Sequence, residues 1–212
     1  MIKNSAFFCI VLLILGCNIN NPQSELRSII VSYHEYKDHK NGEFPLGDFS
    51  EERFENYALF CDSLKLKLET IDSYGLEEND LISYQLLHFV LKETGVKYHY
   101  KTHWNPILSD AGFHSNLTYR VRPISSKKSA LKYLNLLKAI PLYIDQQSTL
   151  IEKGLNAGMG QPLIIFNGYS STYEQHITKT PEENFYYSPF LKLPDQISKQ
   201  EKDSLRLAAK KV

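Results

Sequence analysis

The fold is decided by the stretch 50-SEERFENYALFCDSLKLKLETIDSYG-75, whose apolar residues recur with the period of an α-helix. The residues on the apolar face are Phe54, Tyr57, Ala58, Cys61, Leu64, Leu68 and Ile71. Ser50 begins the helix, Glu51 and Glu52 lie in its first turn, where the helix dipole favours acids, and Gly75 closes it. Such a helix buries one stripe against neighbouring elements, which indicates a helical domain.

Helical periodicity covers most of the chain and predicts an all-α, multi-helix fold. Further helices are expected over residues 25–36, 77–94, 126–140, 142–157, 162–177 and 198–212. Pro141 separates two of them, because proline lacks an amide donor and clashes with the preceding turn. Ser198 and Glu201 have the spacing of a capping box at the start of the last helix. Residues 96–124 show no sustained helical period, so an irregular region with room for a short strand pair is expected there.

The helix expected over residues 77–94 is apolar on two sides. Its apolar residues are Ile82, Leu86 and Phe89 on one face, and Leu81, Tyr84, His88 and Leu91 on another. A helix with two apolar faces is typical of burial between neighbours rather than of a surface position.

The last thirty residues combine an aromatic segment with a helix that has a start signal and no stop signal. Residues 183–194, ENFYYSPFLKLP, are expected to form a loop, because two prolines interrupt them. The helix over residues 198–212 follows, with Leu205, Ala208 and Val212 on one face. We expect these three side chains to lack part of the surface on which they would pack.

The first seventeen residues have the composition of an export signal. Lys3 precedes the apolar run AFFCIVLLIL at residues 6–15, which is too short to span a bilayer comfortably. The sequence ILGC at residues 14–17 resembles a bacterial lipobox, in which the cysteine is lipidated and becomes the new N-terminus. The alternative is an ordinary signal peptide with an accidental cysteine near its cleavage site.

The lipobox divides the chain into a signal peptide (1–16), a lipidated tether (17–24) and a helical body (25–212). Cys17 is then the lipidation site, and the lipid makes a membrane the expected partner. Asn18 is not the aspartate that often retains such lipoproteins in the inner membrane. We therefore expect the protein in the outer membrane, facing the periplasm or the cell surface.

Composition argues against nucleic acid as a partner. The chain has 24 Lys and Arg residues and 24 Asp and Glu residues, so no net field draws it to an anionic polymer. Cys9 would leave with the signal peptide, and Cys61 would then be the remaining free thiol. Since Cys61 lies in an apolar stripe, it is expected to be a small buried side chain rather than a nucleophile.

The strongest candidate metal ligands are His99 and His103, four residues apart. This is the spacing of zinc peptidases, but those place a glutamate directly after the first histidine, and here that position is Tyr100. In an extended segment the two histidines would be about 13 Å apart, too far to share one metal ion. The sequence therefore predicts no metal site, no cofactor and no catalytic residue in this chain.

A pattern of apolar residues, prolines and glycines in the second half of the chain resembles a known family. Its positions are Tyr133, Leu134, Leu137, Pro141, Tyr143, Gln146, Leu150, Gly154, Gly158 and Pro162, then Ser188, Pro189, Phe190, Leu193 and Pro194. The pattern is similar to that of the bacterial family called domain of unknown function eight-eighty-five (DUF885). The resemblance covers residues 25–212.

The resemblance implies a mostly helical, zincin-like metallopeptidase, and many members of the family are lipoproteins. Its metal motif is HExxH-like with an additional Gly-His-His, and it lies beyond the region matched here. Residues 25–212 would then be the N-terminal portion of a larger domain, inactive alone, with zinc and a peptide substrate expected only for the full-length form. The alternative is a non-enzymatic helical lipoprotein that acts as a binding or scaffold unit. The chain would accordingly be a truncated gene product, a fragment or a natural short protein.

Overall fold

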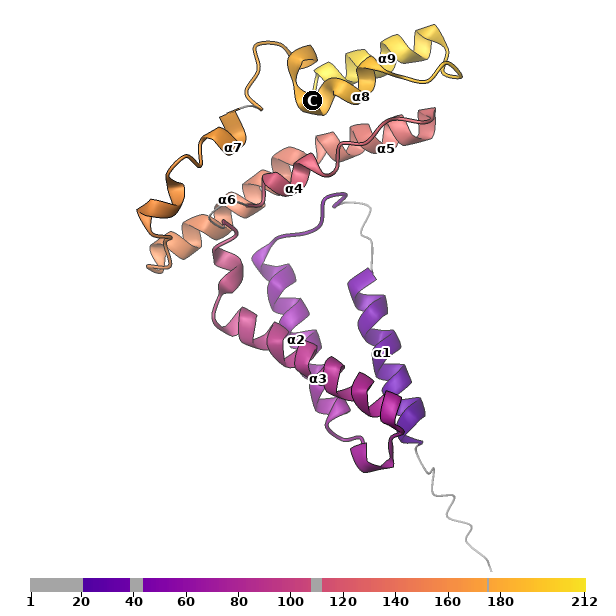
Figure 1. The fold of residues 1–212 in the computed structure, drawn as a ribbon, viewed down its shortest axis with the longest axis vertical. Helices are drawn as coiled ribbons and strands as arrows, with labels where there is room; N and C mark the ends of the chain where they lie inside the picture. Colours follow the sequence, from indigo (N-terminus) through magenta and orange to yellow (C-terminus); the bar gives the residue numbers. More distant parts are fainter. Residues whose placement is uncertain (1–20, 39–43, 108–111, 175) are drawn as a thin grey trace, which may run out of the picture.

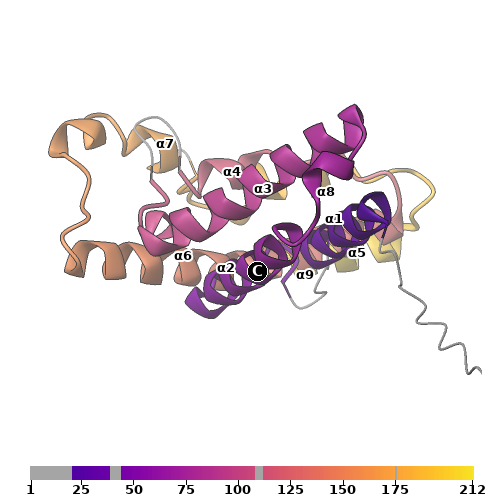
Figure 2. The same ribbon diagram turned by 90° about the horizontal axis from the view of Figure 1, so that it is seen from below.

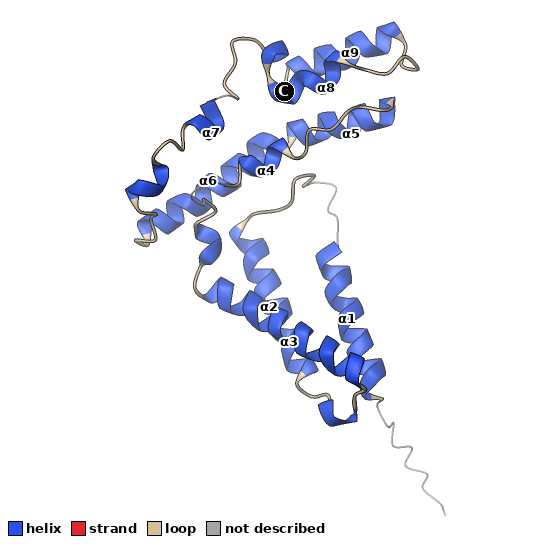
Figure 3. Cartoon of the chain, viewed as in Figure 1, coloured by secondary structure: helices blue, strands red, loops and turns tan. Residues whose placement is uncertain are grey.

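The computed structural model describes residues 21–38, 44–107, 112–174 and 176–212. Within these residues the regular secondary structure consists of α-helices and 3₁₀ turns joined by loops, with no strand (Figure 3). The predicted all-α, multi-helix fold is confirmed. The expected signal peptide and Cys17 lie outside the described residues. No helix within them is long and apolar enough to cross a membrane.

The first three helices pack into one unit around a shared core. They are α1 (Pro22–Asp38), α2 (Glu51–Leu68) and α3 (Glu78–His99), and both α1 and α3 lie against α2 (Figures 1 and 2). Ser50 caps α2 by accepting a hydrogen bond from the backbone N–H of Arg53. The core residues are Leu26, Ile29, Tyr33, Cys61, Leu64, Leu68, Ile71, Leu87 and Leu91. Cys61 is fully buried, as predicted.

Helix α3 is longer than the sequence predicted, since it continues through Gly95 to His99. A Cβ atom at residue 95 would lie 2.9 Å from Oδ1 of Asp62, so the glycine allows α3 to approach α2 closely at this point. The glycine is therefore a packing residue and not a helix stop.

One of the two apolar faces of α3 is exposed. Leu87 and Leu91 are buried against α2, whereas Leu86 and Phe89 are 62% and 61% exposed. The prediction that this helix is buried between neighbours is wrong for the described residues, because they supply a neighbour on one side of it only.

Helices α5 (Lys127–Lys138) and α6 (Ile140–Asn156) follow each other end to end, and they run as one rod between the first unit and the C-terminal helices (Figure 1). Ala139 is both the C-cap of α5 and the N-cap of α6. The predicted break at Pro141 is confirmed, because this residue lies in the first turn of α6. Backbone N–H groups in the first turn have no partner within the helix, so a proline costs no hydrogen bond there.

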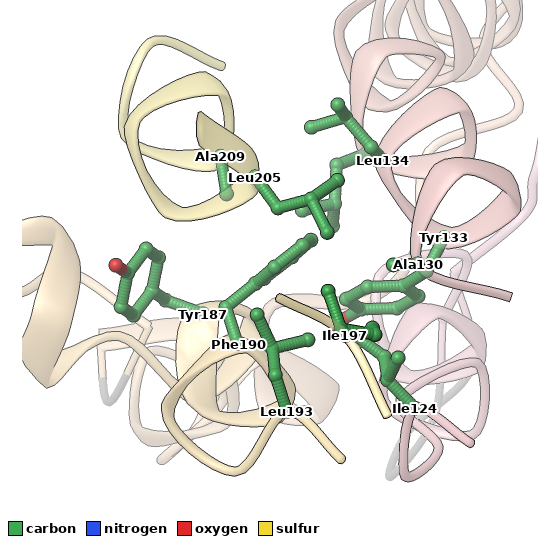
Figure 4. Close-up of a cluster of buried hydrophobic side chains, with 11 residues drawn as sticks. Ile124, Ala130, Tyr133, Leu134, Tyr187, Phe190, Leu193, Ile197, Leu205 and Ala209 are labelled. Carbon is green, nitrogen blue, oxygen red and sulfur yellow. The ribbon is translucent and has the colours of Figure 1, made fainter. Parts of the chain in front are cut away.

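A second core lies between α5, α8 (Ser188–Leu191) and α9 (Lys199–Lys210), with Phe190 at its centre (Figure 4). Residues 183–194 are predicted to form a loop, but they contain the 3₁₀ turn Phe185–Tyr187 and α8, and Tyr187 and Phe190 are buried. The predicted capping box of Ser198 and Glu201 is present. Lys127 Nζ lies 2.6 Å from Glu201 Oε1 and, with hydrogen bonds from Ser198, lowers the pKa of Glu201 to about 2.

The final helix is better packed than the sequence suggested. Leu205 and Ala209 are buried, and Ala208 packs partly against the same core, so these positions have their packing surface. Val212 lies beyond the end of α9 and is exposed. The expectation that Leu205 and Ala208 lack a partner surface is therefore wrong.

The helix expected over residues 162–177 does not form. The segment instead contains the 3₁₀ turn Leu163–Phe166 and the short α7 (Ser171–Glu174). Gly168 lies between them with φ +76°, a left-handed conformation that interrupts a right-handed helix. The helical spacing of Ile165, Phe166, Tyr169 and Tyr173 is thus overridden by the backbone at Gly168.

The irregular region around residues 96–124 is shorter than expected, because α3 takes its first four residues. It contains the 3₁₀ turn Thr102–Trp104, here called η2, and α4 (Ser115–Thr118). Instead of a strand pair, a single antiparallel bridge joins Ile107 and Gly112 in the described part of this region. A small third core of Leu46, Leu117 and Tyr143 joins this region to α6.

Candidate functional site

A partly buried cluster of polar side chains is centred on Glu51, the first residue of α2. Its carboxylate accepts hydrogen bonds from Trp104 Nε1 at 2.6 Å and from His103 Nε2 at 3.1 Å. Lys153 Nζ lies 3.4 Å from Oε2, and Lys101 Nζ lies 3.6 Å from Oε1. These five residues, the Glu51 cluster, bring together α2, η2 and α6.

Two backbone features place these side chains around the carboxylate. Lys101 has φ 52°, the one left-handed conformation among the described non-glycine residues, and it turns the chain from α3 into η2. Gly154 lets α6 approach η2, because a Cβ atom at this position would lie 2.5 Å from the backbone oxygen of Trp104. Gly154, one of the glycines of the family pattern, therefore serves close packing.

His103 is held between two aromatic rings. The Phe54 ring lies 4.4 Å and the Tyr98 ring 5.4 Å from its centroid, with interplanar angles of 25° and 14°. The His103 side chain is 6% exposed. This burial lowers the pKa of His103, although the hydrogen bond and charge of Glu51 act in the opposite direction. His103 is therefore neutral at about pH 7 and donates its Nε2 proton to Glu51.

The Glu51 carboxylate stays ionised. Its partial burial raises its pKa, but the hydrogen bonds from Trp104 and His103 and the charge of Lys153 outweigh that effect and lower the pKa overall. A carboxylate with two N–H donors and two ammonium groups is fully paired, which is the arrangement that makes a partly buried charge tolerable. The cluster thus joins three elements and has no group left over to act on a substrate.

The described residues do not fit a zinc ion at His99 and His103. The Nε2 of His103 is engaged by Glu51, and two lysines lie on the same carboxylate, so a divalent cation would meet positive charge there. His99 lies at the end of α3, with its ring edge against Tyr100. Across the described parts of the chain, no group of three or more His, Cys, Asp or Glu residues is placed to hold a metal ion.

A second polar cluster surrounds His114, ahead of α4. Its Nε2 lies 2.8 Å from Oγ1 of Thr172, and its Nδ1 lies 3.4 Å from the hydroxyl of Tyr169. Both ring nitrogens of His176 are buried without a hydrogen-bond partner among the described residues. Burial, together with the nearby His176, lowers the pKa of His114. Sequence reasoning missed this cluster, since 58 residues separate His114 from Thr172.

Cys61 and His88, two further side chains with reactive or ligating groups, serve packing and an interhelical contact. Burial raises the pKa of the Cys61 thiol, which keeps it protonated and unreactive. His88 Nε2 lies 3.0 Å from Glu69 Oε1 across α2 and α3. Cys17, the predicted lipidation site, lies outside the described residues.

Comparison with known proteins identifies the family. No curated protein and no solved structure matches the chain. The profile of one family does match, over residues 36–212, and its description is "bacterial protein of unknown function (DUF885)". The matched range contains both polar clusters and α2 through α9. The chain therefore belongs to the DUF885 family, as its proline and glycine pattern predicted.

Proposed function

We propose that residues 25–212 form the helical N-terminal portion of a zinc-metallopeptidase-like lipoprotein of the bacterial outer membrane. The observation that carries this proposal is the exposed apolar face of α3, formed by Ile82, Leu86 and Phe89. A stripe of large apolar side chains costs free energy while it faces water. In this proposal the remainder of a larger domain of the same polypeptide covers the apolar face of α3, and the helical portion acts as its scaffold.

In this proposal the chemistry comes from residues outside 1–212. The expected HExxH-like stretch and its Gly-His-His would supply the zinc ligands and a glutamate to activate water. The described residues offer no group of ligands for the metal. The Glu51 carboxylate already accepts two N–H hydrogen bonds and pairs with two lysine ammonium groups. Peptide cleavage is accordingly proposed for the longer form alone.

Metal analysis of the purified 212-residue chain tests the assignment. We expect far less than one zinc per chain after dialysis, and no change in metal content in the double variant His99→Ala with His103→Ala. The reason is that His103 is buried and bonded to Glu51, so the pair cannot converge on one ion. About one zinc per chain, lost in the double variant, would show that this portion holds the metal itself.

Lipid attachment is tested at Cys17. We expect Cys17→Ala to abolish labelling by a radioactive or clickable fatty acid and to release the protein from membranes, because Cys17 carries the lipid in this proposal. Cys61→Ala is the matched control, since Cys61 is buried in the first core and cannot be acylated there. Retention of the Cys17→Ala variant in the membrane fraction would contradict the proposal that the protein is a lipoprotein.

A non-enzymatic binding lipoprotein is the second candidate function. It is favoured by an open cleft next to the third core, which contains an arginine without an ion-pair partner in the described structure. The DNA downstream of codon 212 separates the two candidates. An HExxH-like stretch in any frame supports the longer enzyme, and a stop codon followed by an unrelated gene favours the binding protein.

A further inference from the structure

A cleft of about 280 Å³ lies beside the third core, between α4, α6 and the segment that leads into α2. Its apolar lining is formed by Leu46, Phe49 and Leu117, and its polar lining by Asn116, Tyr119, Arg120 and Tyr143. This combination of apolar side chains with a few polar groups is typical of small-molecule sites.

The floor of the cleft is fixed in the absence of a ligand. Leu46, Leu117 and Tyr143 are buried in the third core, and the Phe49 ring meets the Tyr143 ring edge-on at 5.1 Å. Gln146 accepts a hydrogen bond from the backbone N–H of Phe49 at 3.0 Å, which holds this wall against α6. A ligand would therefore enter a preformed surface and would not have to order it.

Arg120 is the one charged residue that lines the cleft. It forms no ion pair in the part of the chain that the structure describes. Tyr143 donates its hydroxyl proton to the backbone oxygen of Phe113 at 2.8 Å, so it has no proton left for a ligand. Burial raises the pKa of Tyr143, and the charge of Arg120 and a hydrogen bond with Asn116 oppose this increase.

We propose that this cleft binds a carboxylate attached to a small aromatic or aliphatic body. The carboxylate would pair with Arg120, whose planar guanidinium matches it in a bidentate geometry, and the apolar body would lie on Leu46, Phe49 and Leu117. A volume of about 280 Å³ suits a ligand of the size of an aromatic acid. This inference goes beyond the proposed function and does not depend on zinc or on lipidation.

The test is a chemical-shift titration of the purified chain, kept in detergent, with 3-phenylpropionate. We expect saturable shifts with a Kd of roughly 1–10 mM, the range for a ligand of this size at ordinary efficiency. The uncharged 3-phenylpropionamide should bind at least about 5-fold more weakly, because a charge-assisted hydrogen bond is lost. Equal binding of acid and amide would overturn the proposal, as would an acid that produces no saturable shift.

Two arginine variants locate the site. Arg120→Gln should weaken 3-phenylpropionate binding about 5-fold or more and leave amide binding unchanged, since it removes the positive charge from the cleft. Arg122→Gln is the matched control, because Arg122 is exposed, does not line the cleft and donates to the backbone oxygen of Val121. Equal weakening in both variants would show a general effect of positive charge and no site at Arg120.

Discussion

Phe190→Ala is expected to lower the free energy of unfolding by about 3–5 kcal/mol, the range for an aromatic side chain removed from a close-packed core. Phe190 is fully buried, and its ring lies 5.7 Å from the ring of Tyr133 and 5.9 Å from that of Tyr187. Figure 4 shows it pointing between Leu205 of α9 and the side chains of α5. Alanine would leave a cavity where three elements meet, so α9 would lose much of its attachment.

Urea denaturation followed by circular dichroism measures this change. Leu191→Ala is the matched control, because Leu191 follows Phe190 in α8 but is half exposed, and we expect it to cost no more than about 1 kcal/mol. Total stabilities of about 5–15 kcal/mol make the Phe190 loss a large share of the whole. Similar losses in the two variants would show that α8 itself, and not the Phe190 ring, holds this core together.

The parts of the fold that sequence predicted well are those set by local chemistry. Helix α2 has the predicted cap at Ser50, acids in its first turn and one apolar stripe, but it ends at Leu68 and not at Gly75, which lies in a separate 3₁₀ turn. The capping box at Ser198 and the break at Pro141 are likewise decided by residues within one turn of each other. Helix capping and proline geometry act over such short distances that no tertiary contact is needed to predict them.

The predictions that failed depended on distant contacts or on a single backbone conformation. Apolar spacing favoured a helix over 162–177, but left-handed Gly168 interrupts it. Prolines suggested a loop over 183–194, but Pro189 occupies the first turn of α8, which the burial of Phe190 against α5 and α9 stabilises. Propensity is a weak guide where tertiary packing decides.

The Glu51 cluster could not have been predicted from spacing. Its partners at His103 and Lys153 are 52 and 102 residues away along the chain. His99 and His103 have the four-residue spacing of a zinc-binding pair, yet His103 is hydrogen-bonded to Glu51 instead. A local motif shows neither the partner that a side chain finds across the fold nor the charges that surround it.

Glu51→Ala is expected to lower the free energy of unfolding by about 2–3 kcal/mol at about pH 7. The substitution leaves the partly buried N–H donors of His103 and Trp104 without their acceptor, and an unsatisfied donor costs about 1–3 kcal/mol where water cannot replace the acceptor. It also removes the carboxylate with which both Lys101 and Lys153 form ion pairs. Loosening this cluster should separate η2 from α6, because both are held through the same carboxylate.

Glu52→Ala provides the control, since Glu52 is exposed in the same first turn of α2 and experiences the same helix dipole. We expect it to cost about 0.5 kcal/mol. Equal losses at the two positions would attribute the effect of Glu51 to the dipole alone and would contradict the role assigned to the cluster.

The pH dependence follows from the lowered pKa of Glu51. A carboxyl whose pKa is lower in the folded state than its ordinary 4.5 contributes stability that is fully present above pH 4.5 and is lost as the pH falls through the folded value. The difference between the wild type and Glu51→Ala should therefore shrink below pH 4.5. Burial also lowers the pKa of His103 from 6.5, so the wild type should already begin to lose stability as the pH falls below 6.5. Urea denaturation at a series of pH values measures both effects, and a difference that stays constant down to acid pH would show that the Glu51 charge contributes nothing to the fold.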